Sequence, residues 1–469
     1  MAFFGREGLL FFDKLETERN GIMIPRYTTE EMGAVWSELA KKHLWFRVEW
    51  AVLKAKEKLG LIPKGISELA GDIKIDQEIL NRADELERIS DHDLIAFIRA
   101  VTERITAAGE AHVRIKPYLH SGLTSYDIED TALAIQMRES LSILSKGLND
   151  LRSALKRQAL AHRGTVMIGR THGIHAEPIT FGLKLLNWLD VIERHIIRLR
   201  SLDDVVAVGK ISGAVGAFVL DPKIEEETCK ILGLTPARSS TQVISRDIHV
   251  QYVGALVGIA NSLDRFAVNI RRMAGTDFGE VAEHKRPGAK GSSAMPGKSR
   301  LRNPIKSENI SALARIMRGF LISAAECEIL WDERSLDNSA AERISLPDAS
   351  ILLDFMLKRF IAIMESLEVY PEQMAANLRK TGGIVFAQRV MLALAETGIA
   401  RDEAYDLVEG IAMMVECGTF VDSEGRTFEQ LVRQSPDITT RLSSDQIDRC
   451  FDPQQSLKYV DRIYDRFGM

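Results

Sequence analysis

The chain has 469 residues, of which 45% are hydrophobic, enough for a large core divided over two to four domains. Lys and Arg number 61 against 66 Asp and Glu, and this formal charge of −5 gives no support to nucleic-acid binding through bulk charge. No apolar run approaches the ~18 residues of a membrane span. The four cysteines lie far apart without a CxxC pair, which is typical of a reduced, cytoplasmic protein.

Residues 1–114 are expected to form an N-terminal helical domain that begins with an irregular extension, residues 1–24. After Thr28 and Thr29, which could cap a helix, the large side chains recur at steps of three and four. They form the apolar face of an amphipathic helix, namely Trp36, Leu39, His43, Phe46, Trp50 and Leu53. Gly60 and Pro63 end this helix. A further helix is expected over residues 75–111.

Residues 115–366 are expected to form a central bundle of long helices. The first begins at Ser125 or Asp127 and runs for about forty residues, well beyond the usual ~11–12. The others cover about 179–202, 246–279, 305–330 and 347–370. Their broad apolar stripes favour a bundle completed by other subunits, and the alternative is a larger monomeric bundle.

From Pro371 the helices become short and are separated by glycines and prolines, so residues 367–469 are expected to form a small C-terminal helical domain. Alternation with a period of two, which is typical of strands, is almost absent from the whole chain. The predicted fold class is therefore all-α.

One stretch, residues 291–304 (GSSAMPGKSRLRNP), is neither an apolar stripe nor a simple turn. It contains Gly297-Lys298-Ser299, which suggests a phosphate-binding loop. However, five residues lie between Gly291 and Gly297 instead of the four of that motif, and the stretch follows a predicted helix rather than a strand. Hydroxyl, ammonium and guanidinium groups are concentrated here, and polar loops of this kind often carry function. The sequence therefore favours a lid that closes on an anionic substrate over a purely structural loop.

Four histidines lie in or beside breaks between helices: His92, His120, His172 and His175. A histidine can act as acid or base near neutral pH, although a single one is more often a hydrogen-bonded structural residue. Gly173 beside His172 permits a close approach of the backbone to a ligand. A zinc site is the competing interpretation, but no HExxH motif and no nearby cysteine supports it.

Two further kinds of segment could bind anions. Thr124 and Ser125 stand at a helix start, where they act as a plain cap or bind a carboxylate or phosphate through free hydroxyl and N–H groups. Arginines beside hydroxyl residues could bind phosphate through their planar guanidinium groups; these are Arg26 with Tyr27, and Arg334 and Arg343 with Ser339.

The order of these motifs on long helices resembles the fumarase/aspartase superfamily of lyases, and most of all the adenylosuccinate lyase family. Three blocks carry the resemblance: residues 123–127 (LTSYD), 170–178 (RTHGIHAEP) and 291–296 (GSSAMP). Further stretches match around Arg26-Tyr27, residues 91–97, 240–247 and 331–343. The similarity extends from about residue 23 to the C-terminus.

The resemblance implies a homotetramer with a helical core built from all four subunits and active sites formed by three chains. The implied reaction is β-elimination of fumarate from adenylosuccinate, which leaves AMP. The family commonly also cleaves the succinylated aminoimidazole carboxamide ribotide (SAICAR) to AICAR. The implied partner is thus a succinylated purine nucleotide, and neither a cofactor nor a metal is implied.

The resemblance also assigns roles to individual residues. The catalytic ones are Ser292 as the base, His172 as the general acid, His92 as its support, and Lys298, which with Asn303 stabilises the carbanion. The substrate-binding ones hold the carboxylate (Thr124 and Ser125), the phosphate (Arg26, Tyr27, Arg334, Ser339 and Arg343) or other parts of the substrate (Asp93, Gln242 and Ser293).

The chain departs from the family pattern inside the loop and beside His92. The family usually has Met-Pro-His-Lys-Arg-Asn-Pro, whereas Gly297 stands here in place of that histidine. Lys298 and Asn303 are separated by four residues instead of one, an insertion of three within residues 299–302, so Arg300 or Arg302 could take the position of the lysine. Asp91 stands where an arginine is common.

Overall fold

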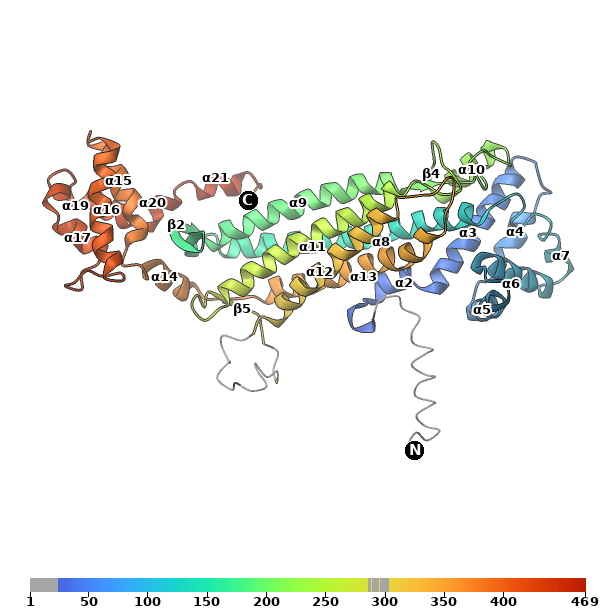
Figure 1. The fold of residues 1–469 in the computed structure, drawn as a ribbon, viewed down its shortest axis with the longest axis horizontal. Helices are drawn as coiled ribbons and strands as arrows, with labels where there is room; N and C mark the ends of the chain where they lie inside the picture. The colour runs from blue at the N-terminus through green and yellow to red at the C-terminus, as the bar shows by residue number, and fades with distance from the viewer. Residues whose placement is uncertain (1–23, 286–287, 289–294, 296–302) are drawn as a thin grey trace, which may run out of the picture. The chain divides into compact units, whose positions relative to one another are not determined.

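The structure, a computed structural model, describes residues 24–285, 288, 295 and 303–469. Almost all of its regular elements are helices, so the predicted all-α class is confirmed (Figure 1). The described strands form three small pairs. Strands β1 (Val166–Thr171) and β2 (Ile174–Thr180) are antiparallel, β3 (Val208–Gly209) and β4 (Thr235–Pro236) are parallel, and β5 (Val281–Ala282) and β6 (Glu368–Val369) are antiparallel.

Five long helices carry the fold, as the apolar stripes predict. They are α8 (Ser125–Ala161), α9 (Phe181–Val206), α11 (Asp247–Met273), α12 (Ile305–Glu326) and α13 (Asp337–Ser366). Contacts between Cα atoms divide the chain into two compact units. Unit 1 contains residues 1–149, 194–263 and 312–358, and unit 2 contains residues 150–193, 264–311 and 359–469, so each long helix contributes residues to both.

Unit 1 adds shorter helices to its share of the long ones. After the 3-10 turn η1 (Pro25–Tyr27) come α2 (Glu30–Val35), α3 (Glu38–Lys58), α4 (Ile66–Gly71), α5 (Gln77–Ser90), α6 (Asp93–Ala107), α7 (Glu110–Val113) and α10 (Pro222–Leu232). Their core includes an edge-on pair, Trp45 and Phe97, with ring centroids 5.8 Å apart. Tyr252 is fully buried on α11, and its hydroxyl lies 2.7 Å from Ser350 Oγ on α13.

Unit 2 contains the β1–β2 pair and the short C-terminal helices. These are α14 (Pro371–Arg379), the 3-10 turn η2 (Ile384–Phe386), α15 (Ala387–Glu396), α16 (Arg401–Cys417), α17 (Phe428–Gln434), α18 (Pro436–Thr439), α19 (Ser444–Phe451), α20 (Pro453–Leu457) and α21 (Val460–Asp465). Capping boxes begin α17 at Thr427 and α19 at Ser443. In the core of this unit Trp188 stacks on Phe266 at 4.8 Å between centroids.

Four predicted elements differ from the structure. The helix predicted after Thr29 is two helices, α2 and α3, and Leu39 and His43 of its predicted apolar face are exposed. Helix α13 begins at Asp337, not at Pro347, so the proline lies inside the helix. Its missing N–H removes one hydrogen bond of the helix, the one to the carbonyl of Arg343. The helix predicted over 75–111 is three helices, interrupted at Asp91, which adopts a φ of 50°, and at Gly109, which adopts a φ of 108°. The break predicted over 164–178 contains the β1–β2 hairpin, which is too short to show a clear alternation.

Candidate active site

His92 and Ser125 meet at the starts of two helices in unit 1. His92 is the N-cap of α6, and its Nδ1 accepts a long hydrogen bond from the N–H of Ile95 at 3.5 Å. Its Nε2 lies 3.3 Å from Ser125 Oγ at the first residue of α8. Because Nδ1 accepts a hydrogen bond, the tautomer that fits has its hydrogen on Nε2. That N–H donates a hydrogen bond to the serine hydroxyl.

The loop that presents Thr124 is fixed by Asp127, whose side chain is fully buried. Its Oδ2 accepts the N–H of Thr124 at 2.9 Å, and its Oδ1 accepts the N–H of Gly213 at 3.1 Å. Lys210, which is also fully buried, donates to the same Oδ1 at 2.5 Å. Asp127 therefore connects the start of α8 to the loop after β3.

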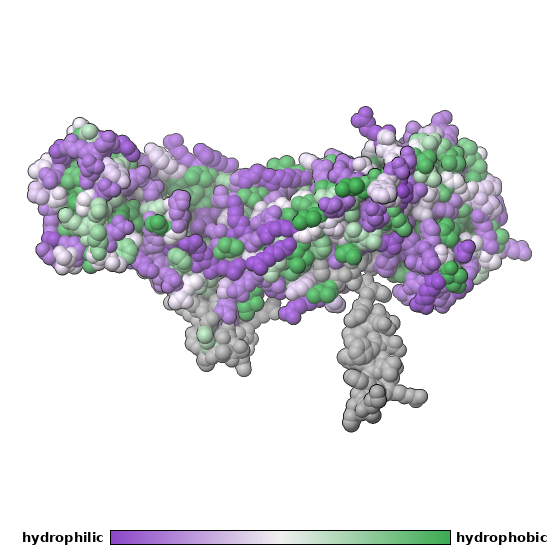
Figure 2. All heavy atoms as spheres, in the orientation of Figure 1, coloured by the Kyte–Doolittle hydropathy of each residue, from purple (hydrophilic) through white to green (hydrophobic). Residues whose placement is uncertain are grey.

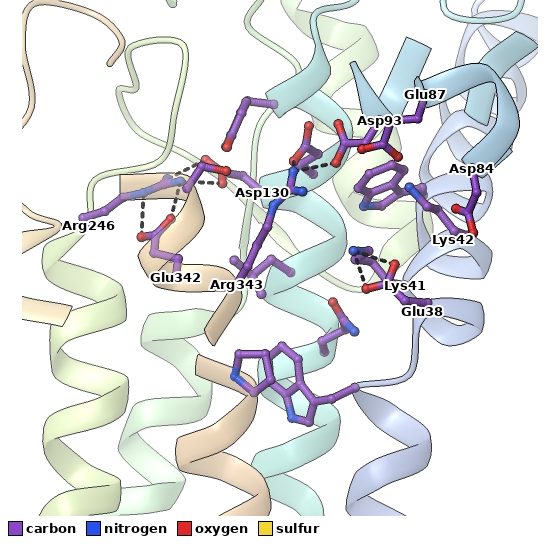
Figure 3. Close-up of a pocket in the computed structure, with 18 residues that line it drawn as sticks. Glu38, Lys41, Lys42, Asp84, Glu87, Asp93, Asp130, Arg246, Glu342 and Arg343 are labelled. Atoms are coloured by element: carbon purple, nitrogen blue, oxygen red, sulfur yellow. Dashed lines mark hydrogen bonds and ion pairs between the residues drawn. The ribbon is translucent and has the colours of Figure 1, made fainter. Parts of the chain in front are cut away.

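A mixed-charge cavity of about 270 Å³ lies beside this helix start (Figure 3). Three of the predicted substrate-binding residues line it: Asp93, Ser339 and Arg343. Arg343 on α13 reaches across to Asp93 on α6, where Nη2 and Oδ2 are 2.5 Å apart, and its Nη2 is 3.5 Å from Glu129 Oε2 on α8. The structure thus brings together residues that are more than 200 positions apart in the sequence.

Burial and charge shift the pKa values of several groups in this cavity. Desolvation, with the nearby Asp93 carboxylate, raises the pKa of Glu129 to about 7. Desolvation lowers the pKa of Lys42 to about 8, and its Nζ lies 3.6 Å from the centroid of the Trp45 ring. Burial opposes the ionisation of Asp93, but the charges of Arg343 and Lys42 outweigh it and lower its pKa.

A second ion network closes one side of the cavity. Arg246 on α11 makes two hydrogen bonds to Asp130, at 2.7 and 3.0 Å, and one to Glu342 at 3.1 Å. His249 Nδ1 is 2.8 Å from the other oxygen of Glu342. All four side chains are buried, and the Arg246 guanidinium is shared by the two carboxylates within the protein.

The other predicted nucleotide-binding residues of unit 1 do not line this cavity. Arg334 stacks its guanidinium 3.9 Å from the ring centroid of Tyr126 and donates to Asn338 Oδ1 at 2.8 Å. Gln242 Nε2 donates to the carbonyl of Ala214 at 3.1 Å. Arg26 is exposed in η1, where the neighbouring Tyr27 ring packs edge-on against Phe355 at 5.3 Å.

His172 lies in unit 2, at the tip of the β1–β2 hairpin. The strands pair Thr171 with Ile174, so His172 and Gly173 form a two-residue loop, with φ of 55° and 87°. Positive φ at both positions is the mark of a type I′ turn, which matches the twist of a hairpin. The imidazole of His172 is thus presented at the surface on a short, well-defined support.

The hairpin is anchored close to its turn by Arg170, which pairs with His175 across the two strands. Its two terminal nitrogens bind both oxygens of the fully buried Glu280, at 3.0 and 2.7 Å. Asn377 Nδ2 donates to the same carboxylate at 2.9 Å. Bidentate pairing of this kind restrains direction as well as distance, so it orients the strand that leads to His172.

Replacing Gly173 with alanine is expected to destabilise the protein by about 1–2 kcal/mol, the usual cost of a left-handed conformation for a residue with a Cβ. The glycine has a φ of +87°, and the added Cβ would lie 2.9 Å from Arg272 Nη2. Gly410→Ala is the matched control, because Gly410 lies inside α16 with open space around it and the substitution should stabilise that helix. Urea denaturation measures both, and equal stability of the two variants would contradict the strain at Gly173.

Three predicted loop residues, Ser292, Ser293 and Lys298, lie outside the described residues. Asn303 is described, and its carbonyl accepts the N–H of Ile305 at 2.9 Å, immediately before α12. Within the described part of the chain, no group of three or more His, Cys, Asp or Glu side chains could hold a metal ion. None of its helices has the length and apolar character needed to cross a membrane.

The sequence assigned no role in the site to Glu129, Lys42 or Lys210, and it marked Asp127 only as a possible helix start and as part of the 123–127 block. Asp127 and Glu129 lie within four residues of Ser125. Two acidic residues so close to the proposed carboxylate-binding pair were the signal in the sequence that could have indicated the ion pairs. Their partners come from other helices, so no local pattern could identify the ion pairs.

The helical fold and these motifs define a lyase. The family model described as "Lyase" matches residues 26–319, and the one described as "Adenylosuccinate lyase C-terminus" matches residues 383–467. The chain is 46% identical over 449 residues to an adenylosuccinate lyase of Synechocystis sp. and 43% identical over 452 residues to that of Bacillus subtilis, covering 95% of this chain and 100% of each relative.

Among solved structures, the fumarate lyase from Mesorhizobium sp. BNC1 is similar with a TM-score of 0.82 and 27% identity, covering 94% of this chain and 97% of that one. Because the matches to the two relatives extend over nearly the whole of both sequences, the assignment is not limited to one part of the chain. The chain belongs to the adenylosuccinate lyase family.

Proposed function

We propose that the protein eliminates fumarate from adenylosuccinate to give AMP, and from SAICAR to give AICAR, in purine nucleotide biosynthesis. The observation that carries this proposal is the similarity to adenylosuccinate lyases over the whole length of those relatives. The cavity agrees with it, since Arg343 and Ser339, both suited to a phosphate group, lie near the His92–Ser125 pair.

The reaction needs a base and an acid at the two ends of the bond that breaks. The base, Ser292, removes a proton from the succinyl carbon next to a carboxylate, and Lys298 and Asn303 stabilise the resulting carbanion. The electron pair then forms the double bond of fumarate while the C–N bond breaks. His172 protonates the departing nitrogen, and His92 supports that step. Neither a metal nor a cofactor takes part.

The remaining residues hold the substrate. Ser125 starts a helix of 37 residues, whose free N–H groups and dipole favour the fumaryl carboxylate beside Thr124. The nucleotide phosphate and the rest of the substrate are bound by a larger set: Arg26, Tyr27, Asp93, Gln242, Ser293, Arg334, Ser339 and Arg343. These residues come from two of the three proposed sequence domains, 1–114 and 115–366. The third domain, 367–469, contains none of them, and all three boundaries are part of the proposal.

The protein is proposed to act as a cytoplasmic homotetramer. Large apolar side chains are exposed in unit 1, among them Ile316 (52%) and Ile322 (66%) on α12 and Ile344 (57%) on α13. Figure 2 shows apolar residues distributed among hydrophilic ones on this face. Where exposed apolar side chains gather into a continuous patch, they mark a surface that another subunit covers. Light scattering coupled to size exclusion should give four times the subunit mass of 52.4 kDa.

Purified protein mixed with adenylosuccinate should form AMP, measured by the change in ultraviolet absorbance. Parallel reactions with SAICAR, argininosuccinate and carboxymuconate test the substrate class. Turnover of either of the last two without turnover of adenylosuccinate would assign another lyase activity. Absence of turnover of every substrate at micromolar enzyme would support a scaffold without activity.

A further inference from the structure

Arg343, a proposed phosphate ligand, is held by two carboxylates in this structure. It pairs with Asp93 at 2.5 Å and lies 3.5 Å from Glu129. Glu129 is only 13% exposed, so water screens its charge poorly. A phosphate dianion that reaches Arg343 would therefore meet two carboxylates at close range, and this repulsion must be relieved for tight binding.

The charged groups that act on Glu129 come from three other helices and from α8 itself. Arg343 faces it from α13, Asp93 from α6 and Lys42 from α3, while Asp130 and Tyr126 are neighbours on α8 itself. On α5 the cavity is lined by two more acidic residues, Asp84 and Glu87.

Most of these charges are already compensated or fixed. Asp130 is bound by Arg246 through two hydrogen bonds. Asp93 stays ionised, since Arg343 and Lys42 lower its pKa, and Lys42 with its pKa of about 8 remains largely protonated below that pH. Glu129 is thus the carboxyl group of this cluster whose charge changes closest to neutral pH, because burial raises its pKa to about 7.

We propose that Glu129 is a positioning residue for Arg343, and that binding of the nucleotide phosphate protonates Glu129 and transfers Arg343 from the carboxylates to the phosphate. The proton comes from solvent and adds to the Glu129 carboxylate. This inference rests on the proposed function, because it requires the phosphate of the nucleotide to bind at Arg343.

The sign of the pH dependence follows from the pKa of Glu129. This pKa is raised, so the neutral form predominates below pH 7 and the carboxylate above it. If binding requires the neutral form, affinity for the nucleotide is highest below pH 7. Above pH 7 the affinity contributed by this group should fall about tenfold for each pH unit, as proton linkage requires for one coupled proton.

The test is titration calorimetry with AMP at pH 6.5, 7.0 and 8.0, in two buffers of different ionisation enthalpy. The wild-type protein should take up a proton on binding, and Glu129→Gln should take up measurably less at pH 7.0 and 8.0. The second ionisation of the AMP phosphate is the same in both titrations, so the difference between them isolates Glu129. Glu129→Ala also removes the carboxyl group, so it provides the same difference if Glu129→Gln folds poorly.

Kinetics gives a second measurement that a merely structural role would not reproduce. Glu129→Gln should lower KM for adenylosuccinate at pH 8.0 by about tenfold, flatten its pH dependence, and leave kcat within about twofold. Glu139→Gln, at an exposed position on the same helix, should behave as the wild type.

The inference would be overturned if the wild type and Glu129→Gln took up the same number of protons and showed the same dependence of KM on pH. The proposed function would remain intact in that case, provided that adenylosuccinate is turned over. If the wild type neither binds AMP nor turns over adenylosuccinate, both proposals fail.

Discussion

His172→Asn is expected to lower kcat by about 10³-fold, within the range of ~10²–10⁴ that a general acid usually contributes. Asparagine is the informative replacement because His172 has a φ of 55° and precedes Gly173 in the hairpin turn. Asn-Gly is the preferred pair in type I′ turns, so the support should remain while the titrating imidazole is lost. Steady-state assays with adenylosuccinate measure the effect.

The control for this experiment is His172→Gln. It removes the imidazole as well, but glutamine adopts positive φ less readily than asparagine. We expect equal losses of activity from the two variants and a lower melting temperature for His172→Gln alone. Near-wild-type turnover by His172→Asn would show that another group protonates the leaving nitrogen.

The long helices were predictable because their stabilising pattern is local. Apolar residues at steps of three and four extend along α8 and α11, and glycine or proline marks many of the breaks. Pro347 misled the prediction because proline usually begins a helix at its first turn, whereas here the helix continues through it. Interior prolines are tolerated where other packing outweighs the lost hydrogen bond, and a sequence pattern does not show that packing.

The candidate site was predictable only in part, for the same reason. Motifs of adjacent residues singled out Thr124, Ser125 and His172 as candidates, and the backbone around Thr124 and His172 is fixed by residues close to them in sequence. The ion pairs are different, because Arg343 and Asp93 are separated by 250 positions. Their contact depends on how α6, α8 and α13 pack. The pairing of Arg343, a proposed phosphate-binding residue, with carboxylates is therefore visible only in the three-dimensional structure.

Lys210→Met is expected to lower the free energy of unfolding by about 3–5 kcal/mol, the usual result of breaking a buried ion pair by removing one partner. Lys210 and Asp127 are both 0% exposed, and Lys210 Nζ is 2.5 Å from Asp127 Oδ1. Without the ammonium group, the carboxylate stays buried with only the N–H groups of Thr124 and Gly213 to stabilise it. Urea denaturation followed by circular dichroism measures this loss.

A double variant separates the uncompensated charge from the lost contact. Asparagine at position 127 has no charge, and its side-chain oxygen can still accept a hydrogen bond from Thr124 or Gly213. Lys210→Met combined with Asp127→Asn should therefore be more stable than Lys210→Met alone, by an amount set by the charge that is removed. If the double variant is no more stable, the cost lies in packing and not in an unpaired carboxylate.

The same pair of variants tests whether the buried ion pair supports substrate binding. Asp127 holds the backbone of Thr124, which is proposed to bind the fumaryl carboxylate at the start of α8. A shift of this loop weakens a contact made in both the bound substrate and the transition state, so KM should rise more than kcat falls. In the double variant, measured at a temperature where it is folded, KM should rise less than in Lys210→Met. An unchanged KM in folded Lys210→Met would show that Thr124 is positioned without this ion pair.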